Sequence, residues 1–149
     1  MAIEDRFSHI VLATDGSEQS QRAARVAGSV ASGLGLPVIV LTVDDKDEEM
    51  PAELAAMRTS RKDIKAGRKE HFAEIAANAR KKLEEQQVTV EEIVTEGDPA
   101  QTIMRVAHDY PAPMVVIGRH GHTGFRELLM GSVSHKVTHT ADCPVLVVN

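Results

Sequence analysis

The chain has 149 residues, 42 % of them apolar and 26 % charged, and it carries a net charge of −5 at pH 7. This length and composition indicate one globular domain over residues 1–149, and the acidic balance excludes a surface that attracts nucleic acid or anionic lipid broadly. A single cysteine excludes an internal disulfide. We find no signal peptide and no apolar run long enough for membrane insertion, and therefore expect a cytoplasmic protein.

The first part of the chain predicts a β-α-β unit. Residues 9–14 form a short, nearly all-apolar run, which is typical of a strand buried on both faces. An apolar stripe at helical spacing then predicts a helix that begins at Ser17 or Glu18 and ends before Gly35. Residues 38–43 form a second buried strand.

The middle of the chain is less regular. Residues 44–61 open with an acidic cluster and show little periodicity, so we predict an exposed segment with a short helix over 52–57. Apolar residues on one face predict a helix over 64–87. Alternation over 88–95 predicts a strand near a sheet edge, where one face is less covered.

The last part repeats the strand and helix alternation. Asp98 as N-cap and Pro99 at the first helical position predict the start of a helix. A buried strand over 114–117, a helix over 132–141 and a strand over 144–148 follow. The order β-α-β-α-β-α-β-α-β predicts an α/β fold of three layers, with an open parallel sheet between helices on both faces.

A glycine-rich loop separates the strand at 114–117 from the last helix, for which Ser132 is the expected N-cap. Glycines let backbone N–H groups approach a phosphate, and the first N–H groups of a helix have no partner of their own. The loop therefore predicts a phosphate cradle; a flexible loop followed by a capped helix is the alternative. The cradle would consist of Gly118, Gly121, Gly131, Ser132 and Val133.

Asp15 follows the first strand, and residues 42–44 follow the second. Ligands of open α/β sheets bind beyond the carboxyl ends of the strands, where the strand order reverses, so these residues and the glycine loop converge if the first and fourth strands are neighbours. Asp15 can then bind ribose hydroxyls or help to hold a divalent cation, or it can be a turn residue. A carboxylate beside a phosphate loop favours a nucleotide over bare phosphate.

The motifs of fast phosphoryl-transfer enzymes are missing, since the chain has no G-x-x-x-x-G-K-[ST] sequence and no G-x-G-x-x-G after its first strand. The histidine pairs His120/His122 and His135/His139 suggest a metal site, but no cysteine or assignable acidic ligand joins them, and a solvated face is preferred. We predict no catalytic residue. Cys143, beside Pro144, is expected to be a small buried residue rather than a nucleophile.

The spacing Gly118-x2-Gly121-x9-Gly131-Ser132, with Ala-Thr-Asp-Gly-Ser over 13–17 and Cys-Pro-Val-Leu-Val-Val over 143–148, resembles the universal stress protein family. The resemblance covers essentially the whole chain. It implies a Rossmann-like fold with a five-stranded parallel sheet of order 3-2-1-4-5, a homodimer joined through the last strand, and binding of ATP or a related adenine nucleotide. A cation such as Mg²⁺ on the nucleotide phosphates is compatible with such a site.

Carried over to this sequence, the resemblance implies that Asp15 approaches the ribose and that Val43 or its neighbours approach the adenine. Ala13, Arg119 and His135 depart from residues frequent in the family; the cradle is intact, but affinity and nucleotide choice stay open. The candidate nucleotide-binding residues are Ala13, Thr14, Asp15, Val43, Gly118, Arg119, Gly121, Gly131, Ser132, Val133 and Ser134.

The last strand also suggests self-association on physical grounds. Val145, Leu146 and Val147 form a continuous apolar run, and an unpaired apolar edge is a liability unless it is covered. Pairing of two copies about a two-fold axis would cover it, as would the chain's own N-terminal segment or helices. We therefore expect an ATP-binding stress-response module that acts as a homodimer on an unknown regulatory protein. A slow ATPase and a nucleotide-free dimeric scaffold are the alternatives.

Overall fold

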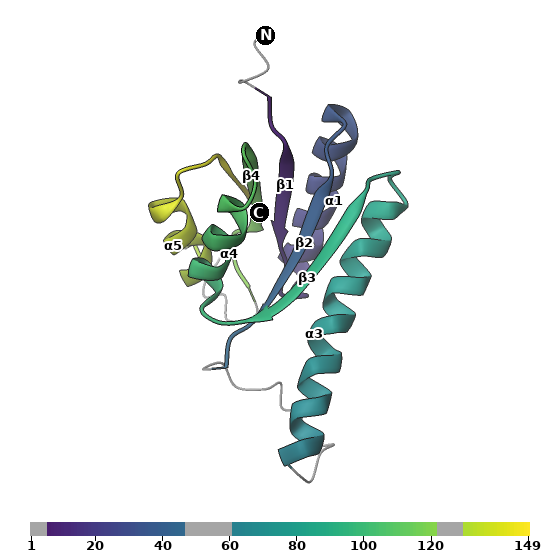
Figure 1. Cartoon of the computed structure of the whole chain (residues 1–149), viewed down its shortest axis with the longest axis vertical. Coiled ribbons are helices and arrows are strands. Elements are labelled where there is room, and N and C mark those ends of the chain that lie inside the picture. Colours follow the sequence, from purple (N-terminus) through teal and green to yellow (C-terminus); the bar gives the residue numbers. More distant parts are fainter. Residues whose placement is uncertain (1–5, 47–60, 122–129) are drawn as a thin grey trace.

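The computed structural model describes residues 6–46, 61–121 and 130–149. The predicted helix over 52–57, His122 and a further glycine of the loop, Gly124, which is not one of the motif glycines, lie outside these residues. The elements in chain order are β1 (His9–Ala13), α1 (Glu18–Leu34), β2 (Val38–Asp44), α3 (Arg61–Glu84), β3 (Val90–Glu96), α4 (Pro99–His108), β4 (Pro113–Gly118), α5 (Ser132–Thr140) and β5 (Val145–Val148) (Figure 1).

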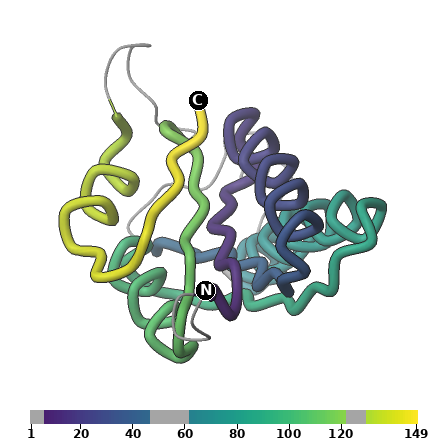
Figure 2. The backbone as a smooth tube through the Cα atoms, turned by 90° about the horizontal axis from the view of Figure 1, so that it is seen from above, coloured from purple at the N-terminus to yellow at the C-terminus, as the bar shows by residue number. Residues whose placement is uncertain are grey.

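The strands form one parallel sheet in the order β3-β2-β1-β4-β5. In the centre of the sheet, Ile10 of β1 pairs with Val38 of β2 on one side and with Met114 of β4 on the other. Helices α1 and α3 cover one face and α4 and α5 cover the other, as the view along the layers shows (Figure 2). This arrangement confirms the predicted three-layer α/β fold and the strand order. No helix among the described residues is long and apolar enough to cross a membrane.

Strand β1 divides the core between the two faces of the sheet. Ile10 and Leu12 pack towards α1 and α3, whereas Val11 and Ala13 pack towards α4 and α5. Helices cover both faces of the sheet, so the side chains of β1 on either face are buried and apolar. This explains why the apolar run in the sequence is unbroken. The alternating strand β3 lies at the sheet edge, as predicted, and its Val94 is 43 % exposed.

Three of the predicted helix boundaries are confirmed by their caps. The side chain of Ser17 accepts a hydrogen bond from the N–H of Ser20 at the start of α1, and Gly35 ends that helix in the left-handed conformation. Asp98 accepts from the N–H of Gln101 at the start of α4. Helix α3, expected over 64–87, begins and ends three residues earlier, at Arg61 and Glu84.

The prediction that Ser132 is the N-cap of α5 is wrong, because Gly131 occupies that position with φ −63° and ψ 159°. The N–H of Gly131 donates to the carbonyl of Arg119 at 2.7 Å, and its own carbonyl accepts the first helical hydrogen bond, from His135. This contact with the loop holds Gly131 extended and makes Ser132 the first helical residue. The start of α5 therefore has no side-chain cap.

The sequence placed Asp44 at the start of an exposed acidic segment, and this expectation is wrong. Asp44 is the last residue of β2, and 8 % of its surface is exposed. The Nε atom of Arg68 on α3 donates to Asp44 Oδ1 at 2.7 Å, and Arg68 Nη2 donates to the carbonyl of Asp45 at 2.6 Å. The first turns of α3 run past the carboxyl ends of the strands (Figure 1). This ion pair therefore fastens the projecting part of α3 to the sheet.

We expect the change Arg68→Leu to lower the free energy of unfolding by about 1–3 kcal/mol, because it leaves a largely buried carboxylate without its charged donor. Urea denaturation measures the effect. Lys69→Leu is the matched control, since Lys69 is an exposed neighbour on the same helix. Equal stabilities of the two variants would show that the ion pair does not hold α3.

Candidate functional site

The carboxyl ends of β1 and β4 lie side by side at the centre of the sheet, where the strand order reverses. The turn after β1, the loop after β4 and the start of α5 meet at this point. The N–H of His120 in the loop donates to Gln19 Oε1 on α1 at 2.6 Å, and the N–H of Gly131 donates to the carbonyl of Arg119. The structure thus brings together two of the three segments that the sequence suggested would converge, the β1–α1 turn and the glycine loop, while residues 42–44 end the neighbouring strand β2.

Asp15 lies directly against the loop. Its Oδ1 atom accepts a hydrogen bond from the N–H of Ser17 at 2.9 Å, so the carboxylate orders the β1–α1 turn. A Cβ atom at Gly121 would overlap Asp15 Oδ2. Glycine at 121 therefore lets the carboxylate and the loop backbone touch, and Asp15 is both a turn residue and a member of the site.

The other two motif glycines also permit close contacts within the protein. A Cβ at Gly118 would lie 3.2 Å from backbone atoms of Gln19 and Ser20, in the first turn of α1. A Cβ at Gly131 would lie 3.1 Å from the carbonyl oxygen of Arg119. Among the described residues, the glycines with positive φ are at other positions, so these motif glycines provide space rather than an unusual backbone conformation.

The first turn of α5 presents a set of backbone donors. Within the described ranges, the N–H groups of Ser132, Val133 and Ser134 have no acceptor, since the first helical bond is made by His135. Such groups, together with the helix dipole, favour an anion. The Ser132 side chain is exposed, whereas the Ser134 hydroxyl is buried and donates to the carbonyl of Gly118 at 2.5 Å.

The remaining predicted residues surround this centre. Ala13 and the half-buried Val43 face the side of α4 and α5, at the ends of the adjacent strands β1 and β2. The hydroxyl of Thr14 points to the opposite side and donates to Ser20 Oγ at 3.1 Å. Arg119 donates its N–H to the carbonyl of Val148 at 2.7 Å, which ties the loop to the end of β5.

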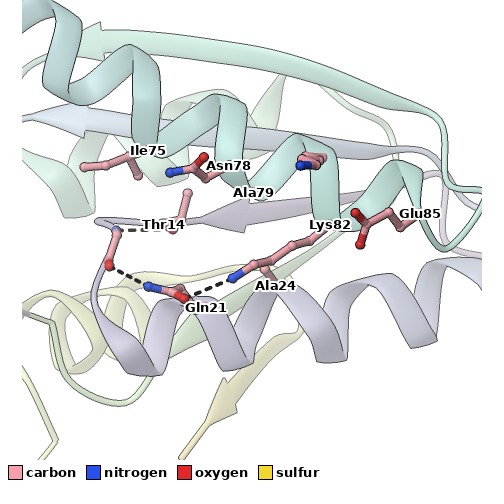
Figure 3. Close-up of a pocket in the computed structure, with 10 residues that line it drawn as sticks. Thr14, Gln21, Ala24, Ile75, Asn78, Ala79, Lys82 and Glu85 are labelled. Carbon is pink, nitrogen blue, oxygen red and sulfur yellow. Dashed lines mark hydrogen bonds between the residues drawn. The ribbon is translucent and has the colours of Figure 1, made fainter.

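A separate cavity of about 470 Å³ lies between α1 and α3 and shares the β1–α1 turn with the site (Figure 3). The side chain of Lys82 reaches from α3 to α1 and donates through Nζ to Gln21 Oε1 at 3.0 Å, and Gln21 Nε2 donates to the carbonyl of Gly16 at 3.2 Å (Figure 3). No pattern in the sequence indicated this cavity. Its lining residues are Thr14, Gly16, Gln21, Ala24, Ile75, Asn78, Ala79, Lys81, Lys82 and Glu85.

The histidine spacing in the sequence suggested His120 only as a metal ligand. The structure shows it 8 % exposed, and neither of its ring nitrogens has a hydrogen-bond partner in the part of the chain described. No group of three metal-ligating side chains occurs among the described residues. The rings of His135 and His139 stack on the exposed face of α5, with centroids 4.6 Å apart.

Cys143 is half-buried and packs against the core beneath α4 and α5. Burial raises the pKa of its thiol, with a smaller contribution from Asp142. A raised pKa disfavours the thiolate, so the structure gives no sign of an activated nucleophile at this position.

Comparisons with known proteins identify the class. Residues 6–149 match the model of the universal stress protein family. The chain is 35 % identical over 147 residues to universal stress protein MJ0531 of Methanocaldococcus jannaschii, covering 97 % of this chain and 84 % of that protein. The chain belongs to the universal stress protein family.

Solved structures agree with this assignment. The structure of MJ0577 from the same organism superposes with a TM-score of 0.78 at 28 % identity, covering 95 % of each chain. A universal stress protein in complex with cAMP superposes with a TM-score of 0.66 at 25 % identity, covering 96 % of this chain and 97 % of the other.

We expect Gly118→Ala to destabilise the fold by about 1–3 kcal/mol, because its Cβ would press on the backbone of α1 rather than on a side chain that can move. Thermal or urea unfolding tests this. Gly33→Ala is the matched control: Gly33 is helical and nothing lies within 4 Å of its Cβ position, so that change should stabilise the protein by about 1 kcal/mol. A neutral Gly118→Ala variant would mean that α1 can shift away freely.

Proposed function

We propose that this universal stress protein binds an adenine nucleotide, with ATP as the first candidate, at the carboxyl edge of β2, β1 and β4. The observation that carries the proposal is the start of α5, which no side chain caps. The N–H groups of its first three residues have no acceptor in the part of the chain that the structure describes, and they lie beside a loop that touches Asp15. The solved relative in complex with cAMP supports the adenine nucleotide class. Its identity to this chain is 25 %, so the ligand itself has to be measured.

The order of the strands gives the nucleotide a direction. A phosphate is attracted to the start of α5 and repelled by the carboxylate of Asp15, so the phosphates belong on the β4 side. Asp15, at the end of β1, would then accept hydrogen bonds from ribose hydroxyls. Val43, half-buried at the end of β2, would contact the base. Base, ribose and phosphates thus follow the order β2, β1, β4 along the sheet edge.

The phosphate contacts would come mainly from backbone N–H groups of the loop and of Ser132, Val133 and Ser134. Arg119 lies in the same loop, and its guanidinium donates to Asn149 Oδ1 at 3.4 Å, so it would have to turn towards the phosphates to contact them. A divalent cation such as Mg²⁺ would bind to the phosphate oxygens, where it offsets their charge. Because the sequence lacks the lysine of a P-loop, we expect binding without fast hydrolysis.

We propose that the protein is a cytoplasmic regulatory module in the stress response, in which the bound nucleotide is read by a protein partner. The first test is the nucleotide content of the purified protein, measured by ion-exchange chromatography of the supernatant after denaturation, followed by calorimetry with Mg·ATP. Bound ATP without turnover supports the module, and steady turnover would make it a slow ATPase. No nucleotide and no binding heat would refute the proposal and leave a dimeric scaffold.

The backbone contribution can be tested at Ser132. We expect Ser132→Pro to lower ATP affinity about tenfold or more, the usual cost of losing one hydrogen bond to a charged group. Proline suits the first position of a helix, and Gly131 before it already has the extended conformation that proline requires. The melting temperature should therefore change little.

Ser132→Ala is the matched control, because it removes the hydroxyl and keeps the N–H group. Its ATP affinity should stay closer to that of the wild type. If the proline and alanine variants bind ATP equally well in calorimetry, the N–H of Ser132 is not a phosphate donor and the assignment of the phosphate position is wrong.

We further propose a homodimer through β5, which pairs with β4 on one side only among the described residues. Pro144 and Val148 direct their carbonyls to β4, so the alternate residues Val145 and Val147 direct their backbone groups to the outer edge. The side chains of Val145 and Val147 pack on the core, whereas Leu146 is 36 % exposed. A charged side chain at position 146 should therefore disturb pairing at the outer edge of β5 without disrupting the core.

We expect Leu146→Glu to shift the protein from dimer to monomer in light scattering, because two copies would place carboxylates at an apolar junction. Leu34→Glu is the control, since Leu34 is 56 % exposed at the far end of α1. A Leu146→Glu protein that stays dimeric would refute this interface.

A further inference from the structure

The imidazole of His120 is an unexplained polar group beside the proposed nucleotide site. The residue is 8 % exposed, and neither Nδ1 nor Nε2 has a hydrogen-bond partner within the described ranges. Buried polar atoms are nearly always hydrogen-bonded, and leaving them unpaired lowers stability. A side chain kept in this state at a candidate binding site points to a partner outside the chain.

The backbone of His120 fixes where that partner lies. Its N–H donates to Gln19 Oε1, which anchors it to the first turn of α1. Its Cα is 3.3 Å from the position that a Cβ at Gly131 would occupy, so it adjoins the N-cap of α5. The next residue, Gly121, touches the carboxylate of Asp15. The backbone of His120 therefore adjoins the proposed phosphate donors, and the residue after it adjoins the proposed ribose acceptor.

The groups around the residue carry charges of both signs, so the chemistry of the ring decides which partner suits it. The ionisable groups that these contacts bring beside His120 are Asp15 on the β1–α1 turn and Arg119 in the loop, while Gln19 on α1 and Gly131 at the start of α5 carry no charge. An imidazole ring carries at least one N–H donor. The oxygens of a nucleotide phosphate are acceptors, so such a ring N–H can donate to one of them.

We propose that His120 is a further ligand-contacting residue of this site and donates a ring N–H to a phosphate oxygen of the bound nucleotide. The inference rests on the proposed function and deepens it. Because adenosine carries no phosphate, the contact should strengthen the binding of ATP and leave the binding of adenosine unchanged.

The first experiment compares ATP and adenosine in calorimetry. His120→Leu removes both ring nitrogens at similar volume, and we expect it to weaken ATP binding about tenfold or more while adenosine affinity stays unchanged. His120→Gln keeps a donor and should retain part of the affinity for ATP. His139→Gln, at the exposed far end of α5, is the matched control and should bind both ligands like the wild type.

The second experiment observes the ring directly. The ring ¹⁵N shifts of His120 in the wild-type protein should change when ATP binds and stay unchanged when adenosine binds. A merely structural role of His120 would not produce this difference between the two ligands.

The outcomes separate the two levels of the proposal. If the wild type binds neither nucleotide nor adenosine, the proposed function fails and this inference fails with it. If the wild type binds ATP but the His120 variants match it, or lose ATP and adenosine equally, only the inference is overturned. If His120→Leu does not fold, the glutamine variant and the ring shifts decide.

Discussion

The site depends on the close approach of backbone segments at three motif glycines. Gly118 lets the first turn of α1 rest on the end of β4, Gly121 lets Asp15 touch the loop, and Gly131 lets the start of α5 rest on Arg119. A side chain at any of these positions would have to move backbone atoms or a carboxylate. The three glycines are therefore needed first for the backbone segments to come together. The space for a phosphate results from that packing.

The same contacts connect the loop to the edge of the sheet. Arg119 donates to the carbonyl of Val148 at the end of β5, and the Ser134 hydroxyl donates to Gly118, which ends β4. A ligand on the loop thus acts on residues that are hydrogen-bonded to both strands at this side of the sheet. Since the proposed dimer uses the free edge of β5, nucleotide state and dimer contacts would share one set of hydrogen bonds.

Sequence analysis could predict what depends on local patterns. Apolar runs located β1 and β2, and the side chains of Ser17 and Asp98 marked helix starts because their partners lie three residues further on. Contacts between distant residues could not be read in this way. The partner of Asp44 is 24 residues away and that of His120 is 101 residues away, so neither the buried ion pair nor the anchored histidine had a local signal.

The error at Ser132 has the same origin and is informative about the site. Serine is the preferred N-cap by local propensity, but the hydrogen bond from Gly131 to the loop moves the cap back by one residue and leaves α5 without a side-chain acceptor. Helix α5 lacks the side-chain hydrogen bond at its N-cap, which typically stabilises a helix by about 1 kcal/mol. A ligand with phosphate oxygens would supply the missing acceptors, so the departure from local preference is located where a nucleotide would restore the lost hydrogen bonds.

The charge of the whole molecule places a further demand on these contacts. With a net charge of −5, the protein does not attract an anionic nucleotide from a distance. Under the proposed function, affinity would come from short-range donors that act once the ligand is in place, namely the N–H groups at the start of α5 and the ring of His120. Changes at these groups should consequently alter the dissociation rate more than the association rate.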